Sequence, residues 1–133
     1  MSRPIKFRGW HTELKKMFSP EELAADQLTL LTTGRFINVS GDFPQNSIIY
    51  SLDKFIPLQF TGLLDKTGKE IFEGDIVAQY DWKGIADNSV IKWFQPRCGF
   101  WIFKGAEAHL ELGDYRNNLL VIGNLYENPG LLP

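Results

Sequence analysis

The chain has 133 residues, of which 44% are hydrophobic and 14% aromatic, and its formal net charge is −2. This length and composition predict one folded domain with a buried core and exclude disorder of the whole chain. The negative charge excludes a global positive field that would recruit nucleic acid or an anionic membrane, but it leaves room for a local basic patch. Cys98 has no intrachain partner, and no stretch resembles a secretory signal or an apolar membrane span. We therefore expect a protein of a reducing cytoplasm.

The N-terminal residues predict a β-hairpin. Residues 4–10 alternate between apolar and basic side chains, as in a half-buried strand. The polar residues 11–15 follow as a turn, and residues 16–18 are expected to return as a short partner strand.

A helix is predicted to begin directly after this hairpin. Ser19 has the properties of an N-cap, Pro20 suits the first helical position, and Glu22 completes a capping box. The helix is expected to be short, near residues 20–26, and to be followed by a strand. A longer amphipathic helix over residues 23–31 is the alternative. Farther along, we predict a strand at 36–39, a loop at 41–47 and a strand at 48–50.

The middle of the chain predicts a second hairpin. Asp65 and Gly68 are the end residues of a four-residue segment with type I turn chemistry, because Asp accepts a local backbone bond and Gly tolerates positive φ. The arms of this hairpin are residues 58–64 and 69–72. Gly74 then permits a sharp bend before the next strand.

The second half of the chain continues with short apolar segments separated by polar or glycine-containing breaks. Residues 106–112 fit neither a helix nor a strand clearly. Strands are predicted at residues 75–82, 89–95, 100–103 and 119–126, with a loop at 83–88 and a turn at 96–99. Strands at such intervals favour an all-β barrel or sandwich. The predicted fold is therefore mainly β, a small β-barrel of short antiparallel strands with an N-terminal β-hairpin and one short helix near residues 20–26.

Several strings of the sequence resemble the YopX family of phage and prophage proteins. They lie at residues 5–10, 15–17, 60–77 and 121–129. The resemblance implies a bacteriophage or prophage origin, a mainly β fold built around a small barrel, homo-oligomerisation, and no established activity. It also implies a single YopX-like domain over residues 1–133, with a variable insert at about 20–57 and the barrel core at about 58–133.

One position departs from the family pattern. Gly9-Trp10-His11 stands where the resemblance leads us to expect Ala-Trp-Asp. The loss of the acid weakens any hypothesis that gives this position a chemical role.

Three carboxylates lie close together in the sequence, at Glu70, Glu73 and Asp75. Such a group would suit acid and base chemistry or a divalent ion. We favour a structural role, because Gly74 marks a bend at which an acid caps backbone donors. The sequence identifies no base or metal partner for these acids.

Metal, thiol and nucleotide chemistry lack recognisable motifs. His11, Cys98 and His109 do not have the spacing of a zinc site, and a lone cysteine in an intracellular protein usually packs as a small hydrophobe. The glycines form no phosphate-binding loop. We therefore predict no catalytic residues, no metal site and no cofactor.

Aromatic and basic residues alternate in the second half of the chain and form the candidate surface for a partner or for nucleic acid. This set contains Trp82, Lys83, Lys92, Trp93, Arg97, Trp101 and Lys104. Small barrels bind single strands by stacking bases on aromatic rings while cations follow the phosphates. Since the strands must also fill a core, we expect at least half of these aromatic side chains to be buried.

The leading hypothesis is a non-catalytic phage accessory protein of the bacterial host cytoplasm. It would bind an unknown macromolecular partner, or another copy of itself, through a barrel face or an edge strand. No membrane association is expected. A nucleic-acid-binding small barrel is the first alternative, and an enzyme that uses one of the three carboxylates with a divalent ion is the second.

Overall fold

The computed structural model describes residues 4–38, 54–80, 83–84, 86–115 and 118–132. The chain forms two compact units: an N-terminal unit, Lys6–Gln59, and a C-terminal unit, Phe60–Pro133 with Met1–Ile5. The boundary between the two units lies between Gln59 and Phe60. A single domain over residues 1–133 stays a prediction.

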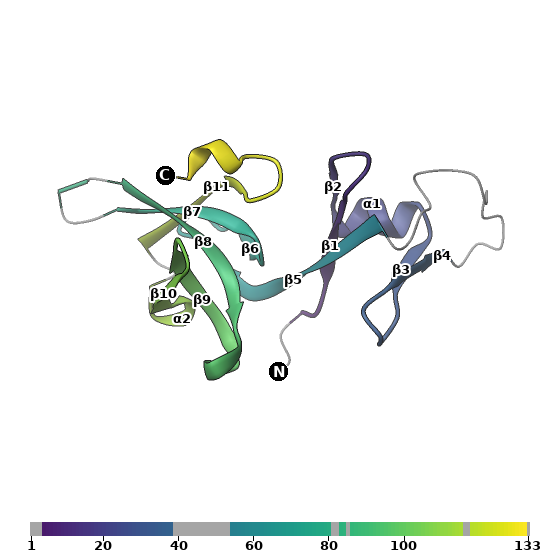
Figure 1. Ribbon diagram of the computed structural model, residues 1–133, viewed down its shortest axis with the longest axis horizontal. Coiled ribbons are helices and arrows are strands. Elements are labelled where there is room, and N and C mark those ends of the chain that lie inside the picture. The colour runs from purple at the N-terminus through teal and green to yellow at the C-terminus, as the bar shows by residue number, and fades with distance from the viewer. Residues whose placement is uncertain (1–3, 39–53, 81–82, 85, 116–117, 133) are drawn as a thin grey trace. The chain divides into compact units, whose positions relative to one another are not determined.

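Antiparallel strands dominate both units, which confirms the mainly β fold (Figure 1). In the N-terminal unit, β1 (Phe7–His11) pairs with β2 (Lys16–Phe18), as the predicted hairpin requires. The other edge of β1 pairs with the first half of β5 (Phe55–Leu64). The predicted loop at 41–47 and strand at 48–50 lie outside the described residues.

The short helix α1 (Pro20–Ala25) begins as predicted. The Ser19 hydroxyl accepts a hydrogen bond from the Glu22 N–H at 3.1 Å, and the Glu22 carboxylate accepts one from the Ser19 N–H at 3.2 Å. Gln27 then adopts a positive φ of 58°, which ends the helical path. The chain continues as β3 (Leu28–Leu30), paired with β4 (Phe36–Asn38), so the shorter helix followed by a strand is correct.

The N-terminal unit has its own apolar core. Its buried members come from β2, α1, β3, β4 and β5, and they are Phe18, Leu23, Leu28, Phe36 and Phe55. The ring of Phe55 is central to this cluster, with centroids 5.3 Å from Phe18 and 5.4 Å from Phe36. The leucine of α1 is thus held by tertiary packing, which a helix this short requires.

The predicted central hairpin is confirmed in β5 and β6 (Glu70–Phe72). The Gly68 N–H donates to the Asp65 carbonyl at 3.0 Å, and Gly68 has a φ of +88°. The register shifts between Phe60 and Leu64, where β5 bulges. A positive φ at Gly62 accompanies this bulge.

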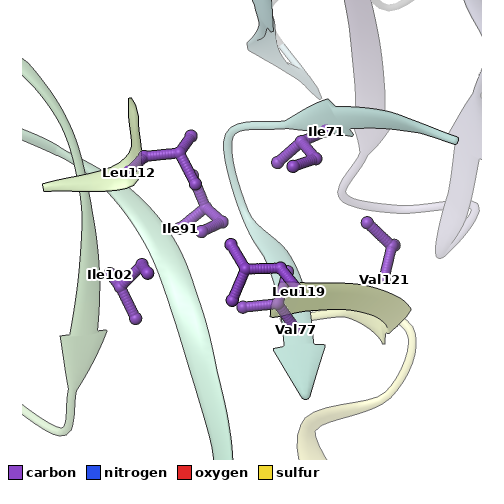
Figure 2. Packing of buried hydrophobic residues seen from close by; sticks show 7 residues of the cluster. All are labelled: Ile71, Val77, Ile91, Ile102, Leu112, Leu119 and Val121. Carbon is purple, nitrogen blue, oxygen red and sulfur yellow. The ribbon is translucent and has the colours of Figure 1, made fainter. Parts of the chain in front are cut away.

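A curled sheet forms most of the C-terminal unit (Figure 1). Within the described residues its strands, in spatial order, are β10 (Glu107–Glu111), β9 (Gly99–Lys104), β8 (Ala86–Phe94), β7 (Asp75–Tyr80) and β11 (Leu119–Asn124). All neighbours are antiparallel, and the sheet curves as half of a barrel around an aliphatic core. Figure 2 shows this core, composed of Ile71, Val77, Ile91, Ile102, Leu112, Leu119 and Val121.

Several boundaries in this sheet differ from expectation, and β11 ends at Asn124 instead of residue 126. β8 begins at Ala86 instead of residue 89, because residues 86–88 pair with the end of β7 and shorten the predicted loop. Residues 107–111, which the sequence left unassigned, form β10, and a single helical turn, α2 (Leu112–Tyr115), follows it.

The segment that follows β11 contains a 3₁₀ turn, η5 (Pro129–Leu131). Within the described ranges, no helix is long and apolar enough to cross a bilayer.

Candidate functional site

At least one of the carboxylates in the acid-rich bend after β6 has a structural role. Asp75 is 2% exposed, and its Oδ2 accepts a hydrogen bond from the Phe72 N–H at 2.7 Å. Gly74, between them, has a φ of +88°. The predicted capping of backbone donors is therefore confirmed for Asp75. Among the described residues, no three His, Cys, Asp or Glu side chains form a metal-binding group.

His11 takes the position at which the family resemblance leads one to expect an aspartate. The imidazole is fully buried, and its Nδ1 accepts hydrogen bonds from the N–H groups of Glu13 (3.3 Å) and Leu14 (3.1 Å). Its ring also meets the Phe55 ring edge-on at 4.9 Å. The nitrogen thus supplies an acceptor for a turn, which is what an aspartate at a turn commonly does.

A network of side chains closes the segment that follows β11. Asn124 Oδ1 accepts from the N–H groups of Tyr126 and Glu127, at 3.0 and 2.8 Å, and its amide donates to the Glu127 carboxylate at 2.8 Å. Asn128 Oδ1 in turn accepts from the Asn124 N–H at 3.1 Å. A Cβ at Gly123 would lie 2.6 Å from this Asn128 oxygen. These residues therefore have a structural role, and position 123 needs glycine because the Asn128 side chain packs directly against it.

The predicted surface residues divide between two faces of the β8–β9 pair. Lys92 stands opposite Trp101, and Trp93 stands opposite Phe100. Because side chains alternate along a strand, Lys92 and Trp101 share one face and Trp93 lies on the other. The set is therefore not one continuous surface.

The remaining members of the predicted set lie at the ends of these strands. Lys83 is exposed in the turn before β8, and Arg97 is exposed in the 3₁₀ turn η3 (Gln95–Arg97) between β8 and β9. Lys104 ends β9 and forms an ion pair with Asp87. Trp82 lies outside the described residues.

The expected burial of these aromatic side chains was wrong. Trp93 is 44% exposed, and its indole N–H donates to Gln95 Oε1 at 2.8 Å, while Trp101 is half-buried. The reason is competition for the core, since Ile91 and Ile102 occupy the fully buried positions of β8 and β9. Large rings are thus left on partly exposed positions.

An aromatic–lysine face, defined by Lys92, Phe94, Trp101 and Phe103, results from this arrangement. The Phe94 ring centroid lies 5.1 Å from that of Trp101 and 5.8 Å from that of Phe103, with edge-on geometry in both pairs. The Lys92 ammonium lies 5.5 Å from the Phe103 centroid. All four side chains are half-buried, so the face has rigid rings and one cation at the surface.

A hollow of about 440 Å³, here named the β8–β9 hollow, borders this face. Its lining combines strand residues with the C-terminal segment, and it consists of Asp87, Asn88, Val90, Lys92, Phe103, Lys104, Gly105, Leu125 and Leu132. The Asn88 side-chain amide donates to the Leu131 carbonyl at 2.9 Å, which attaches the end of η5 to β8. Leu125 and Leu132 thereby serve as one wall of the hollow.

Sequence reasoning found part of this site and missed the rest. Lys92, Trp101 and Lys104 belong to the predicted set, whereas Phe103 does not. The sequence does not indicate that Leu125 and Leu132 line the hollow, because their position depends on where the chain turns back after β11. Alternation along β8, with Asn88, Val90 and Lys92 on one face, was the available signal.

The fold and this site define a small, mainly β protein whose half-barrel sheet carries an aromatic–lysine face beside an apolar hollow. The family model described as YopX protein matches residues 6–133, and the chain belongs to the YopX family. The chain is also similar to the protein EF1440 from Enterococcus faecalis, known from a crystal structure, with a TM-score of 0.65 and 27% sequence identity. That similarity covers 99% of this chain and 100% of the other. No match was found among curated proteins.

Proposed function

We propose that this protein is a non-catalytic accessory protein of a bacteriophage or prophage. In this proposal it acts in the cytoplasm of the bacterial host and binds a macromolecular partner, or a second copy of itself, through the aromatic–lysine face. The observation that carries the proposal is the register of β8 and β9, which places Lys92 opposite Trp101 beside the hollow.

The chemistry of this face supports binding. Aromatic rings that are held by neighbouring rings offer large contact areas at low conformational cost, and aromatic residues are enriched where interfaces gain most of their energy. The ring pairs of Phe94 with Trp101 and with Phe103 restrict their motion before a partner arrives. The described carboxylates Asp65 and Asp75 are by contrast engaged with backbone N–H groups, which supports a non-catalytic role.

Photo-crosslinking at single positions tests the proposal. A benzoylphenylalanine at Phe94 places the reactive group on the aromatic–lysine face, and the same residue at Leu31, which is 42% exposed in the N-terminal unit, serves as the control. Both variants are expressed in the bacterial host of the phage. We expect a discrete crosslinked product from position 94 that is absent from position 31.

Mass spectrometry of the crosslinked product shows whether the protein was joined to a foreign partner or to a second copy of itself. The mass of the purified protein, measured by light scattering, tests independently whether it forms a dimer. Crosslinking that is equal at both positions, or absent at 94 in a protein of monomeric mass, would overturn the proposal.

A further inference from the structure

We infer that the β8–β9 hollow binds an acidic peptide segment of the partner, taking up one apolar side chain while a neighbouring carboxylate contacts Lys92. This inference rests on the proposed function and adds the chemistry of the ligand.

The size and lining of the hollow suit a side chain. Its volume of about 440 Å³ falls in the range of small-molecule pockets, so it has room for a side chain. Val90, Phe103, Leu125 and Leu132 provide apolar walls from three different parts of the chain. Transfer of an aliphatic side chain from water into such surroundings is favourable in proportion to the area buried.

The charges of the hollow select an anion. Lys104 is already neutralised by its ion pair with Asp87. Lys92, in contrast, has no carboxylate within ion-pair distance among the described residues, and its ammonium lies against the Phe103 ring. One uncompensated ammonium beside an apolar hollow complements a ligand that has one carboxylate next to an apolar group.

A peptide fits this surface better than a nucleic acid. Single-stranded nucleic acids require a row of cations along their phosphates, in addition to rings for stacking. Here the neighbouring strand β10 places Glu111 opposite Trp101, on the same face, and this glutamate is exposed. A phosphate backbone crossing this face would meet its negative charge, whereas a short peptide with one acid would not need to approach it.

The test is an NMR titration of the ¹⁵N-labelled full chain with two matched peptides, acetyl-Gly-Leu-Asp-Gly-amide and acetyl-Gly-Leu-Asn-Gly-amide. The acidic peptide is expected to shift the amide signals of Val90, Phe103 and Leu125 and to bind about tenfold more tightly than the neutral one. The substitution Lys92→Gln should abolish this preference. Lys69→Gln removes an exposed lysine elsewhere in the same unit and should leave the preference unchanged.

A second variant, Leu132→Ser, tests the apolar wall at a half-buried position outside the aliphatic core, so unfolding is not expected. This substitution should lower the binding affinity of both peptides by a similar factor. Equal affinity for the two peptides, an unchanged preference in Lys92→Gln, or no binding of either peptide would overturn the inference. So would tighter binding of an eight-nucleotide oligothymidine to the same residues. In each case, crosslinking from position 94 decides separately whether the face itself is a binding surface.

Discussion

The carboxylate of Asp65 accepts a hydrogen bond from the backbone N–H of Val121 at 2.9 Å, although 56 positions separate the two residues in the sequence. The other oxygen, Oδ1, accepts from the Thr67 N–H (2.8 Å), the Thr67 hydroxyl (2.7 Å) and the Lys69 N–H (3.0 Å). One buried side chain therefore both closes the β5–β6 turn and connects it to the final strand of the sheet.

The substitution Asp65→Asn should destabilise the protein markedly. The amide keeps the volume of the side chain but replaces one acceptor oxygen by a donor, so that at least one buried N–H loses its partner. We expect the free energy of unfolding to fall by about 1.5–3 kcal/mol, the range for hydrogen bonds to a charged group. Urea unfolding at pH 7 measures this, with Glu107→Gln on an exposed strand as the control. Equal losses in the two variants would contradict this account of Asp65.

The same carboxylate makes stability depend on pH. Burial alone would raise the pKa of Asp65, but hydrogen bonds from Val121, Thr67 and Lys69 outweigh burial and hold its pKa below the ordinary value. The folded pKa is thus lower than the unfolded pKa of about 3.9, so the stabilisation is complete above that pH and is lost as pH falls through the folded pKa. The difference in stability between wild type and Asp65→Asn should therefore narrow from pH 5 to pH 2. The pKa of Glu22 is also lowered, but Glu22 is present in both proteins, so its contribution to the pH dependence cancels in the difference. A difference that stays constant over this range would refute the assignment.

His11 should stabilise its turn through the acceptor on its ring. The substitution His11→Phe keeps an aromatic ring against Phe55 but leaves the N–H groups of Glu13 and Leu14 without that acceptor. We expect a loss of about 1–3 kcal/mol in the free energy of unfolding. His11→Asp restores an acceptor and should recover the hydrogen exchange protection of these two amides, even though it lacks the ring. If His11→Phe retained full protection at both amides, the role of the nitrogen would be refuted.

Gly123 should not tolerate alanine. The added Cβ would lie 2.6 Å from Asn128 Oδ1 and displace the side chain that binds the Asn124 N–H. A loss of about 1–3 kcal/mol is expected from such overpacking. Gly130→Ala is the matched control, because a Cβ there meets nothing within 4 Å. In a double-mutant cycle, Asn128→Ala should make the cost of Gly123→Ala smaller, and strict additivity would argue against the clash.

Local features of this fold follow from the sequence because they depend on residues that are neighbours in the chain. The Ser19 capping box, the Asp65 to Gly68 turn and the bend at Gly74 each need one side chain or one positive φ, and all three occur where predicted. Some residues in the segments that match the family pattern contribute to such features, since Asp65 and Asn124 accept hydrogen bonds from backbone N–H groups of the turns that follow them.

The candidate site depends instead on the tertiary structure. Strand alternation allowed Trp93 and Trp101 to be either core or surface, and the outcome was decided by which residues of the neighbouring strands filled the interior. The hollow likewise requires Leu125 and Leu132 to meet β8 after the chain has turned at Asn124. Sequence by itself thus determined where the chain turns and that strands would result. Only packing decided which side chains are left to bind, because burial is a competition among residues that are far apart in the sequence.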